Sequence, residues 1–204
     1  MFELLLILTL GALQPLIEVF ADSRTATWFN VSAAVCVLGY VVYALSRSGI
    51  VVLREWGIRT DTFLPMFPVY AIFTAVGSVC VILLGRYMGH TSLPVTFWYL
   101  VALYPVWGIA QQFALQNLLA RNLVPLVPHI ALRSLIVATC FAVAHLPSMP
   151  LAATTFIAGL FFVPLYHRYP NLLLIGTAHG ILGSLVFTLV LGQNQWDILT
   201  KYLS

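Results

Sequence analysis

Charged residues are scarce in this chain. Only 7% of its 204 residues are Asp, Glu, Lys or Arg, whereas 61% are hydrophobic. Soluble domains carry about 25% charged residues, so a water-soluble fold of this length would lack polar surface. A mean hydropathy of +1.00 agrees with this comparison. The composition therefore predicts an integral membrane protein.

Acidic residues are the scarcest of the charged ones. The six in the chain are Glu3, Glu18, Asp22, Glu55, Asp61 and Asp197. The 135 residues between Asp61 and Asp197 contain no Asp or Glu. This stretch therefore excludes an acidic metal cage and a paired-carboxylate hydrolase site built within it.

The basic residues are eight arginines and one lysine, spread singly along the chain. A nucleic-acid-binding protein needs a basic patch or stripe, so no nucleic-acid partner is expected. Single arginines at the ends of membrane helices contact lipid headgroups, which makes membrane lipid the expected surrounding. The three cysteines lie in apolar runs without CxxC spacing and are expected to be buried thiols. We expect no metal and no cofactor, although His129 remains open as a third ligand beside His145 and His179.

Long apolar stretches predict the fold. About 20 helical residues cross a bilayer core, and a helix satisfies its own backbone hydrogen bonds there. Seven stretches qualify, at about 2–20, 28–46, 63–84, 94–120, 130–146, 151–166 and 171–191. The fourth is too long for one straight span and is expected to end near Arg121, ahead of two prolines. We predict an all-α, polytopic transmembrane helix bundle of about seven spans.

Short connections and the absence of repeats or linkers predict one domain. Residues 1–204 form a single integral membrane domain in this interpretation, with N-terminal spans in 1–94 and a core in 95–191. The first stretch has no basic residues before it, so we expect a membrane helix rather than a cleaved signal. The longer connection at 47–62 is expected to lie along the membrane interface as an amphipathic segment.

Arginine asymmetry predicts the orientation. With seven spans, the side that holds the N-terminus collects five arginines and the other side two arginines and Lys201. The first set is Arg47, Arg54, Arg59, Arg121 and Arg168, and the second is Arg24, Arg86 and Lys201. The N-terminus is therefore expected to be cytoplasmic, in the plasma membrane of a prokaryote.

Polar side chains inside spans are costly and usually face a bundle interior or a wet cavity. Three places carry them: Gln111, Gln112, Gln116 and Asn117 in the fourth stretch, Phe141 to His145 in the fifth, and His179 in the seventh. A single amide or histidine would be expected only to form a hydrogen bond between helices, worth about 0.6 kcal/mol. Three glutamines within six residues, with two intramembrane histidines, favour a polar cavity instead.

These positions resemble a known family. The motifs are Gln111-Gln112-xxx-Gln116, Phe141-xxx-His145 and His179-xxx-Gly183, with a connector from 156 to 171. In order and spacing they are similar to the EExxxR, FxxxH and HxxxN motifs of the CPBP family. That family includes the type II CAAX prenyl proteases and bacteriocin-processing or immunity membrane proteins. The resemblance covers about residues 95–190 and implies a CPBP-like core in the second half.

The departures from the family's motifs bear on its activity. The resemblance implies that the positions of Gln111 and His145 activate a water, and that those of His179 and Gly183 stabilise the oxyanion. Here both glutamates and the arginine are replaced by glutamine, and the asparagine by glycine. Because a glutamine accepts no proton from water, the carboxylate chemistry is lost or strongly reduced. A buried arginine at 116 would lack its acidic partner, so the changes compensate one another.

Three functions follow from this pattern. The first is a pseudoenzyme that binds a membrane protein or a lipid-like ligand, with Gln116, Asn117, Phe141 and Gly183 lining its cavity. The second is an active intramembrane endopeptidase that uses His145 and His179, with Gln111 and Gln112 at motif positions. A transporter ranks last, because ionisable residues are almost absent from the spans. Three acids outside the motifs are considered as substitutes for the missing glutamates: Glu18, Asp22 and Glu3. For Glu18, a role at the membrane interface is expected instead.

Overall fold

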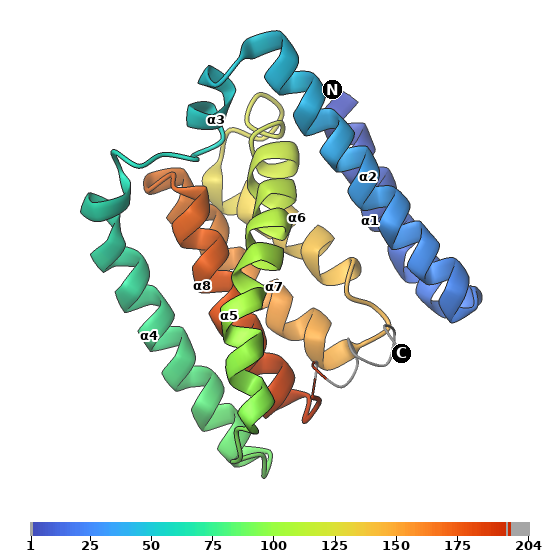
Figure 1. The fold of residues 1–204 in the computed structure, drawn as a ribbon, viewed down its shortest axis with the longest axis vertical. Helices are drawn as coiled ribbons and strands as arrows, with labels where there is room; N and C mark the ends of the chain where they lie inside the picture. Colours follow the sequence, from blue (N-terminus) through green and yellow to red (C-terminus); the bar gives the residue numbers. More distant parts are fainter. Residues whose placement is uncertain (1, 195, 197–204) are drawn as a thin grey trace. The chain divides into compact units, whose positions relative to one another are not determined.

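The computed structural model describes residues 2–194 and 196, and every regular element among them is helical. Figure 1 shows the chain from its blue N-terminal helices to the red C-terminal one. The α-helices are α1 (Phe2–Phe20), α2 (Ser23–Ser48), α3 (Val51–Glu55), α4 (Phe63–Tyr87), α5 (Val95–Gln112), α6 (Ile130–Val143), α7 (Met149–Arg168) and α8 (Leu172–Leu185). Two π-helical segments, η1 (Phe113–Ala120) and η2 (Val186–Val190), extend α5 and α8. The predicted all-α class is confirmed.

Within residues 2–194 and 196, five helical stretches are long and apolar enough to cross a membrane. They are Phe2–Phe20, Arg24–Ser48, Phe63–Tyr87, Met149–Arg168 and Leu172–Val190. The fourth predicted stretch is α5 continued by η1, and it ends at Ala120, as expected from the prolines that follow. At 14 residues, α6 is about 21 Å long and shorter than a bilayer core. The chain is an integral membrane protein with a helical membrane bundle.

The described residues form two compact units. Of the described residues, 2–59 and 114–170 form the first unit, and 60–113, 171–194 and 196 form the second. The chain passes from the second unit to the first inside the Gln111–Gln116 motif, between Phe113 and Ala114. The single-domain interpretation stays a prediction.

In the first unit, α1 and α2 form a hairpin, and α6 packs along α7 (Figure 1). Asp22 caps α2, because its Oδ1 accepts from the backbone nitrogen of Thr25 at 2.7 Å. The core gathers buried residues from α1, from η1 and the turn after it, from α6 and from α7: Leu4, Leu115, Leu119, Ala120, Leu123, Val137, Phe141 and Val163. The apolar faces of four segments thus bury one another.

A carboxylate ties three parts of the first unit together. Glu3, in the first turn of α1, accepts from the hydroxyl of Tyr40 on α2. It also accepts from Nδ2 of Asn122, just after η1, at 2.5 Å. A carboxylate in an apolar surrounding needs such donors, because an unpaired charge there is strongly unfavourable. Glu3 is therefore a structural residue of this unit.

In the second unit, α4, α5 and α8 lie side by side (Figure 1). Its apolar core includes Phe97, Leu185 and Leu189. Asn171 caps α8 by accepting from the backbone nitrogen of Leu174 at 3.1 Å, and its Nδ2 donates to Oγ1 of Thr62 at 3.1 Å. A single buried side chain thus starts α8 and holds it to the residue before α4.

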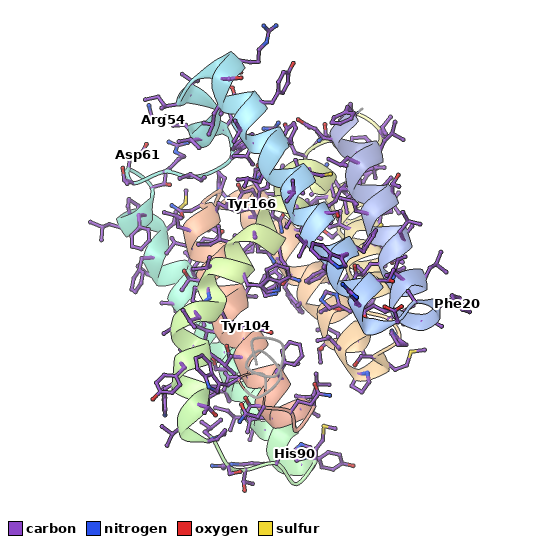
Figure 2. All side chains as sticks on the ribbon, turned by 45° about the vertical axis from the view of Figure 1, so that its right-hand side comes forward. Phe20, Arg54, Asp61, His90, Tyr104 and Tyr166 are labelled. Carbon is purple, nitrogen blue, oxygen red and sulfur yellow. The ribbon has the colours of Figure 1, made fainter. Side chains whose placement is uncertain are left out.

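The connection at 47–62 contains the short helix α3 and little other regular structure. Figure 2 labels Arg54 and Asp61 along it. Its predicted place along the membrane interface and the predicted orientation of the N-terminus remain expectations. Asp197 and Lys201, used in the charge analysis above, lie outside the described residues.

Candidate functional site

Helices α5 and α8 meet through glycines in the second unit. A β-carbon on Gly176 would lie 2.5 Å from Cα of Ile109, and one on Gly180 would lie 2.5 Å from the backbone nitrogen of Pro105. Gly108 of α5 likewise faces the carbonyl of Gly176 without room for a β-carbon. Small residues allow membrane helices to approach backbone to backbone. Because the two helices approach so closely here, the side chain one turn after Gly108 on α5 lies within reach of α8.

That side chain belongs to Gln112, the last residue of α5. Its Nε2 lies 2.9 Å from Nδ1 of His179 on α8. Because an amide nitrogen only donates, Nδ1 is the acceptor and the ring carries its proton on Nε2. Gln112 is fully buried, and His179 is half-buried. His179 is therefore a neutral imidazole whose Nε2–H is a hydrogen-bond donor.

The environment of Gly183 is set by Tyr104, labelled on α5 in Figure 2. A β-carbon on Gly183 would lie 3.5 Å from two ring carbons of Tyr104 and 3.8 Å from Cδ2 of His179. These are ordinary van der Waals distances. A side chain at 183 would therefore stand between the tyrosine ring and the imidazole, beside the Gln112–His179 pair.

The motif of glutamines straddles a change in helix type. Gln111 and Gln112 end α5, whereas Gln116 and Asn117 lie in η1. The backbone nitrogen of Arg121 donates to the carbonyl of Gln116 at 3.0 Å, which is the five-residue spacing of a π-helix. Such widened turns are rare and are frequently found at functional sites. Gln111 is half-buried, and it belongs to the second unit together with Gln112.

Gln116 and Asn117 are both buried in the first unit. Nδ2 of Asn117 donates to the carbonyl of Trp56 at 3.3 Å. The hydroxyl of Tyr166 on α7, labelled in Figure 2, donates to the same carbonyl at 2.9 Å. The carbonyl of Trp56, just after α3, thus joins Asn117 of η1 to Tyr166 near the end of α7.

His145 lies two residues beyond the end of α6, also in the first unit. Its Nδ1 lies 2.7 Å from the carbonyl oxygen of Phe141, and the two rings meet edge to face with centroids 4.9 Å apart. Because a carbonyl only accepts, Nδ1 donates and Nε2 presents its lone pair. The FxxxH spacing therefore fixes both the orientation of the ring and its tautomer.

The predicted site residues fall into two groups. The second unit brings Gln112, His179 and Gly183 together, with Gln111 next in the chain. The first unit holds Gln116, Asn117, Phe141 and His145. The two histidines are in opposite states, since His145 offers an acceptor at Nε2 and His179 a donor. Their roles in a reaction or in ligand binding remain predictions.

Sequence reasoning did not identify the glycines that place this pair. The signal for them was present, because Gly176 and Gly180 are four residues apart and share one face of an apolar helix. Their partners on α5, Gly108 and Pro105, are not recognisable without the packing. The role of Glu3 was also missed, since no local pattern indicates its contacts with Tyr40 and Asn122.

Two of the acids considered as substitutes, Glu18 and Asp22, make local contacts in the first unit. Glu18 is exposed and accepts from Nε2 of Gln14 at 3.0 Å, one turn earlier in α1. Asp22 is exposed and caps α2. An exposed side chain at a helix end is what the interfacial interpretation of Glu18 expects. Among residues 2–194 and 196, no three His, Cys, Asp or Glu side chains cluster closely enough to hold a metal ion.

A family model matches part of the chain. Residues 91–185 match the model described as type II CAAX prenyl endopeptidase Rce1-like. The match covers α5, η1, α6, α7 and α8, and therefore includes all three motifs. It confirms the resemblance to the CPBP family predicted from the motifs. The comparisons with curated proteins and with solved structures gave no match.

Proposed function

We propose that this CAAX-protease-like membrane protein, with its Rce1-like core over residues 91–185, binds a membrane protein or a lipid-like ligand and does not cleave it. The observation that carries the proposal is the bond between Gln112 and His179. A carboxylate beside an imidazole accepts protons and stabilises the protonated ring. An amide does neither, so Gln112 supplies no charge that would stabilise a protonated imidazole.

The burial of the motif's amides supports the same conclusion. Gln112, Gln116 and Asn117 are each at most 2% exposed. A charged side chain at any of these positions would need a partner of opposite sign, because an uncompensated buried charge is strongly destabilising. Three neutral amides need hydrogen bonds only. The substitutions therefore suit a stable, uncharged core better than a hydrolytic one.

The side chain at 183 offers a test of ligand binding. Substitution of Gly183 by Phe would place a ring beside Tyr104 and His179 and occlude this part of the second unit. The matched control is Gly39→Phe, since nothing lies within 4 Å of a β-carbon there. The protein, extracted in mild detergent, should retain a stoichiometric membrane protein or lipid, measured by native mass spectrometry. G183F should lose it and G39F should keep it. Recovery of the bare chain in every preparation would contradict the proposal.

One observation favours the alternative, an active intramembrane endopeptidase. His145 presents the lone pair of Nε2, as a base that activates water must, and His179 presents an N–H donor of the kind that stabilises an oxyanion. This alternative predicts cleavage of a prenylated CAAX peptide by the wild-type protein. It fails if the rate equals that of the variant carrying both His145→Ala and His179→Ala.

The orientation is part of the proposal. Five arginines on the side of the N-terminus support a cytoplasmic N-terminus in a prokaryotic plasma membrane. Reporter enzymes fused within residues 49–62 and within 88–94 test it. Cytoplasmic activity in the first fusion and periplasmic activity in the second are expected, and the reverse result would overturn this orientation.

A further inference from the structure

The first unit contains a cavity that is lined by Gln116 and Asn117, as expected from the motifs, and also by charged side chains that the motifs do not include. Its volume is about 160 Å³, and it is open on one side. The polar side chains that line it are Glu55, Gln116, Asn117, Arg121, Arg133, Tyr166 and His167. With two guanidinium groups against one carboxylate, the lining carries net positive charge. A cavity of this charge at the end of a membrane helix is unusual in a chain with so few charged residues.

Arg133 is the most informative of these side chains. It is only 3% exposed. Its Nη1 donates to the carbonyls of Val127 and Pro128, at 3.1 and 3.5 Å. In the part of the chain that the structure describes, no carboxylate contacts it. Because a buried cation is costly unless an anion compensates it, Arg133 points to an anionic ligand in the cavity that it lines.

Arg121 adds a second cation that an incoming anion can recruit. Its Nη1 lies 4.0 Å from a carboxylate oxygen of Glu55, and both side chains are substantially exposed, at 40% and 60%. An exposed ion pair of this length contributes little to stability. An anion in the cavity therefore competes easily with Glu55 for Arg121.

The location of the cavity indicates where its ligand comes from. Tyr166 and His167 are in the last turn of α7, a membrane-spanning helix, and both line the cavity. Glu55 belongs to the connection that follows another spanning helix, α2. The cavity therefore lies at the end of a spanning helix, where a bilayer would place its phosphate groups. Basic pockets between transmembrane helices at this depth are suited to lipid headgroups.

The volume limits the size of the ligand. The space of about 160 Å³ holds several waters, since each water needs only about 10–15 Å³ for its centre. One tetrahedral oxyanion fits such a space, whereas pockets for drug-sized ligands are about 300–1,000 Å³. A guanidinium group binds phosphate oxygens with parallel hydrogen bonds, which neither an ammonium nor an amide can match.

We propose that this cavity binds the phosphate group of an anionic phospholipid, held by Arg133 and Arg121. The cavity shares Gln116 and Asn117 with the ligand cavity expected for the proposed function, but the phosphate site uses neither histidine of the motifs. Glu55 opposes the ligand by charge and by its contact with Arg121, so its carboxylate sets the affinity. A lipid tail runs from the open side of the cavity into the surrounding bilayer.

Thermal unfolding of the purified full-length protein in detergent tests the proposal. The probes are phosphatidylglycerol, phosphatidylcholine and inorganic phosphate. Phosphatidylglycerol at 100-fold excess over its Kd should raise the Tm by about 5–10 °C, and phosphatidylcholine by much less. R121Q and R133Q should weaken the apparent affinity for phosphatidylglycerol by about tenfold or more. R47Q is the matched control, because Arg47 is an exposed arginine at the end of α2 and outside the cavity.

Glu55→Gln keeps the test decisive if R133Q does not fold. Removal of the opposing carboxylate should tighten phosphatidylglycerol binding severalfold, a gain that a misfolded variant cannot imitate. An unchanged or weaker affinity in E55Q, or equal losses in R47Q and R121Q, would overturn the proposal. If inorganic phosphate raises the Tm as much as phosphatidylglycerol does, the oxyanion site stands and its lipid source is wrong.

Discussion

The amide nitrogen of Gln112 donates to Nδ1 of His179 across a distance of 2.9 Å. The two residues come from α5 and α8, which approach so closely that Gly176 and Gly180 leave no room for a β-carbon. The resemblance to the CPBP family places a glutamate at 112. The helix contact is thus kept, while the group that would charge the imidazole is absent.

The first prediction concerns the tautomer of His179. In the wild-type protein, ¹⁵N NMR of labelled histidine in nanodiscs should show His179 protonated at Nε2 and His145 protonated at Nδ1. In Gln112→Glu, the carboxylate accepts only, so His179 must donate from Nδ1 and become the other tautomer or the imidazolium. Histidine-to-glutamine substitutions assign each signal. A wild-type His179 protonated at Nδ1 would contradict the hydrogen bond described here.

The second prediction concerns the glycines between α5 and α8. Gly176→Ala and Gly180→Ala should each destabilise the protein by about 1–3 kcal/mol, because the added methyl group pushes the helices apart. For a chain of this size, this lowers the Tm by roughly 2–4 °C for each kcal/mol. Thermal unfolding in detergent measures the change.

Gly39→Ala is the matched control for these substitutions. It lies within α2, and nothing is within 4 Å of a β-carbon there. Alanine is the better helix former, so this variant should be as stable as the wild type or more so. Equal Tm changes at 39, 176 and 180 would show that the close approach of α5 to α8 is not required.

Much of this fold was predictable from the sequence. The apolar stretches indicated the membrane helices, and Pro125 and Pro128 correctly placed the end of the fourth stretch near Arg121. Hydropathy reports on the surrounding lipid, and this is why it identifies helices well. It predicts helices that are too short where polar residues still belong to the helix. Helix α2 accordingly begins at Ser23, five residues before the predicted stretch.

The site was predictable only in part. The spacing of the motifs identified Gln112 and His179, but nothing in the sequence joins two residues 67 positions apart. The π-helical turn at Gln116 was not expected, because the hydrophobic pattern of a π-helix is hard to distinguish from that of an α-helix over so short a stretch. Arg133 looked like an isolated charge, and only its burial beside the cavity gives it meaning.

The third prediction concerns Asn171, which both caps α8 and donates to Thr62. Asn171→Ala should destabilise the protein by about 1 kcal/mol or more through loss of the cap. Asn171→Asp keeps the cap acceptor but lacks the Nδ2 donor to Thr62. It should therefore lose only the second contact, as Thr62→Val does. If N171D is as destabilised as N171A, the cap is not the main contribution of this residue.

The fourth prediction concerns Glu3 as the acceptor for Tyr40 and Asn122. Tyr40→Phe and Asn122→Ala each remove one hydrogen bond to a charged group, which is worth about 1.5–3 kcal/mol. In a Glu3→Ala background the same substitutions should cost much less. A double-mutant cycle in chemical unfolding measures the difference. Additive effects would show that these side chains do not act through Glu3.

The cleavage of a prenylated CAAX peptide by protein in nanodiscs tests the central claim most directly. Three proteins are compared: the wild type, the double variant with His145→Ala and His179→Ala, and a variant with the family's motif residues restored. The restored variant carries Gln111→Glu, Gln112→Glu, Gln116→Arg and Gly183→Asn. We predict equal background rates for the first two and a faster rate for the third, since a positioned base contributes about 10²–10⁴-fold. A wild-type rate well above that of the double histidine variant would contradict the loss of protease chemistry.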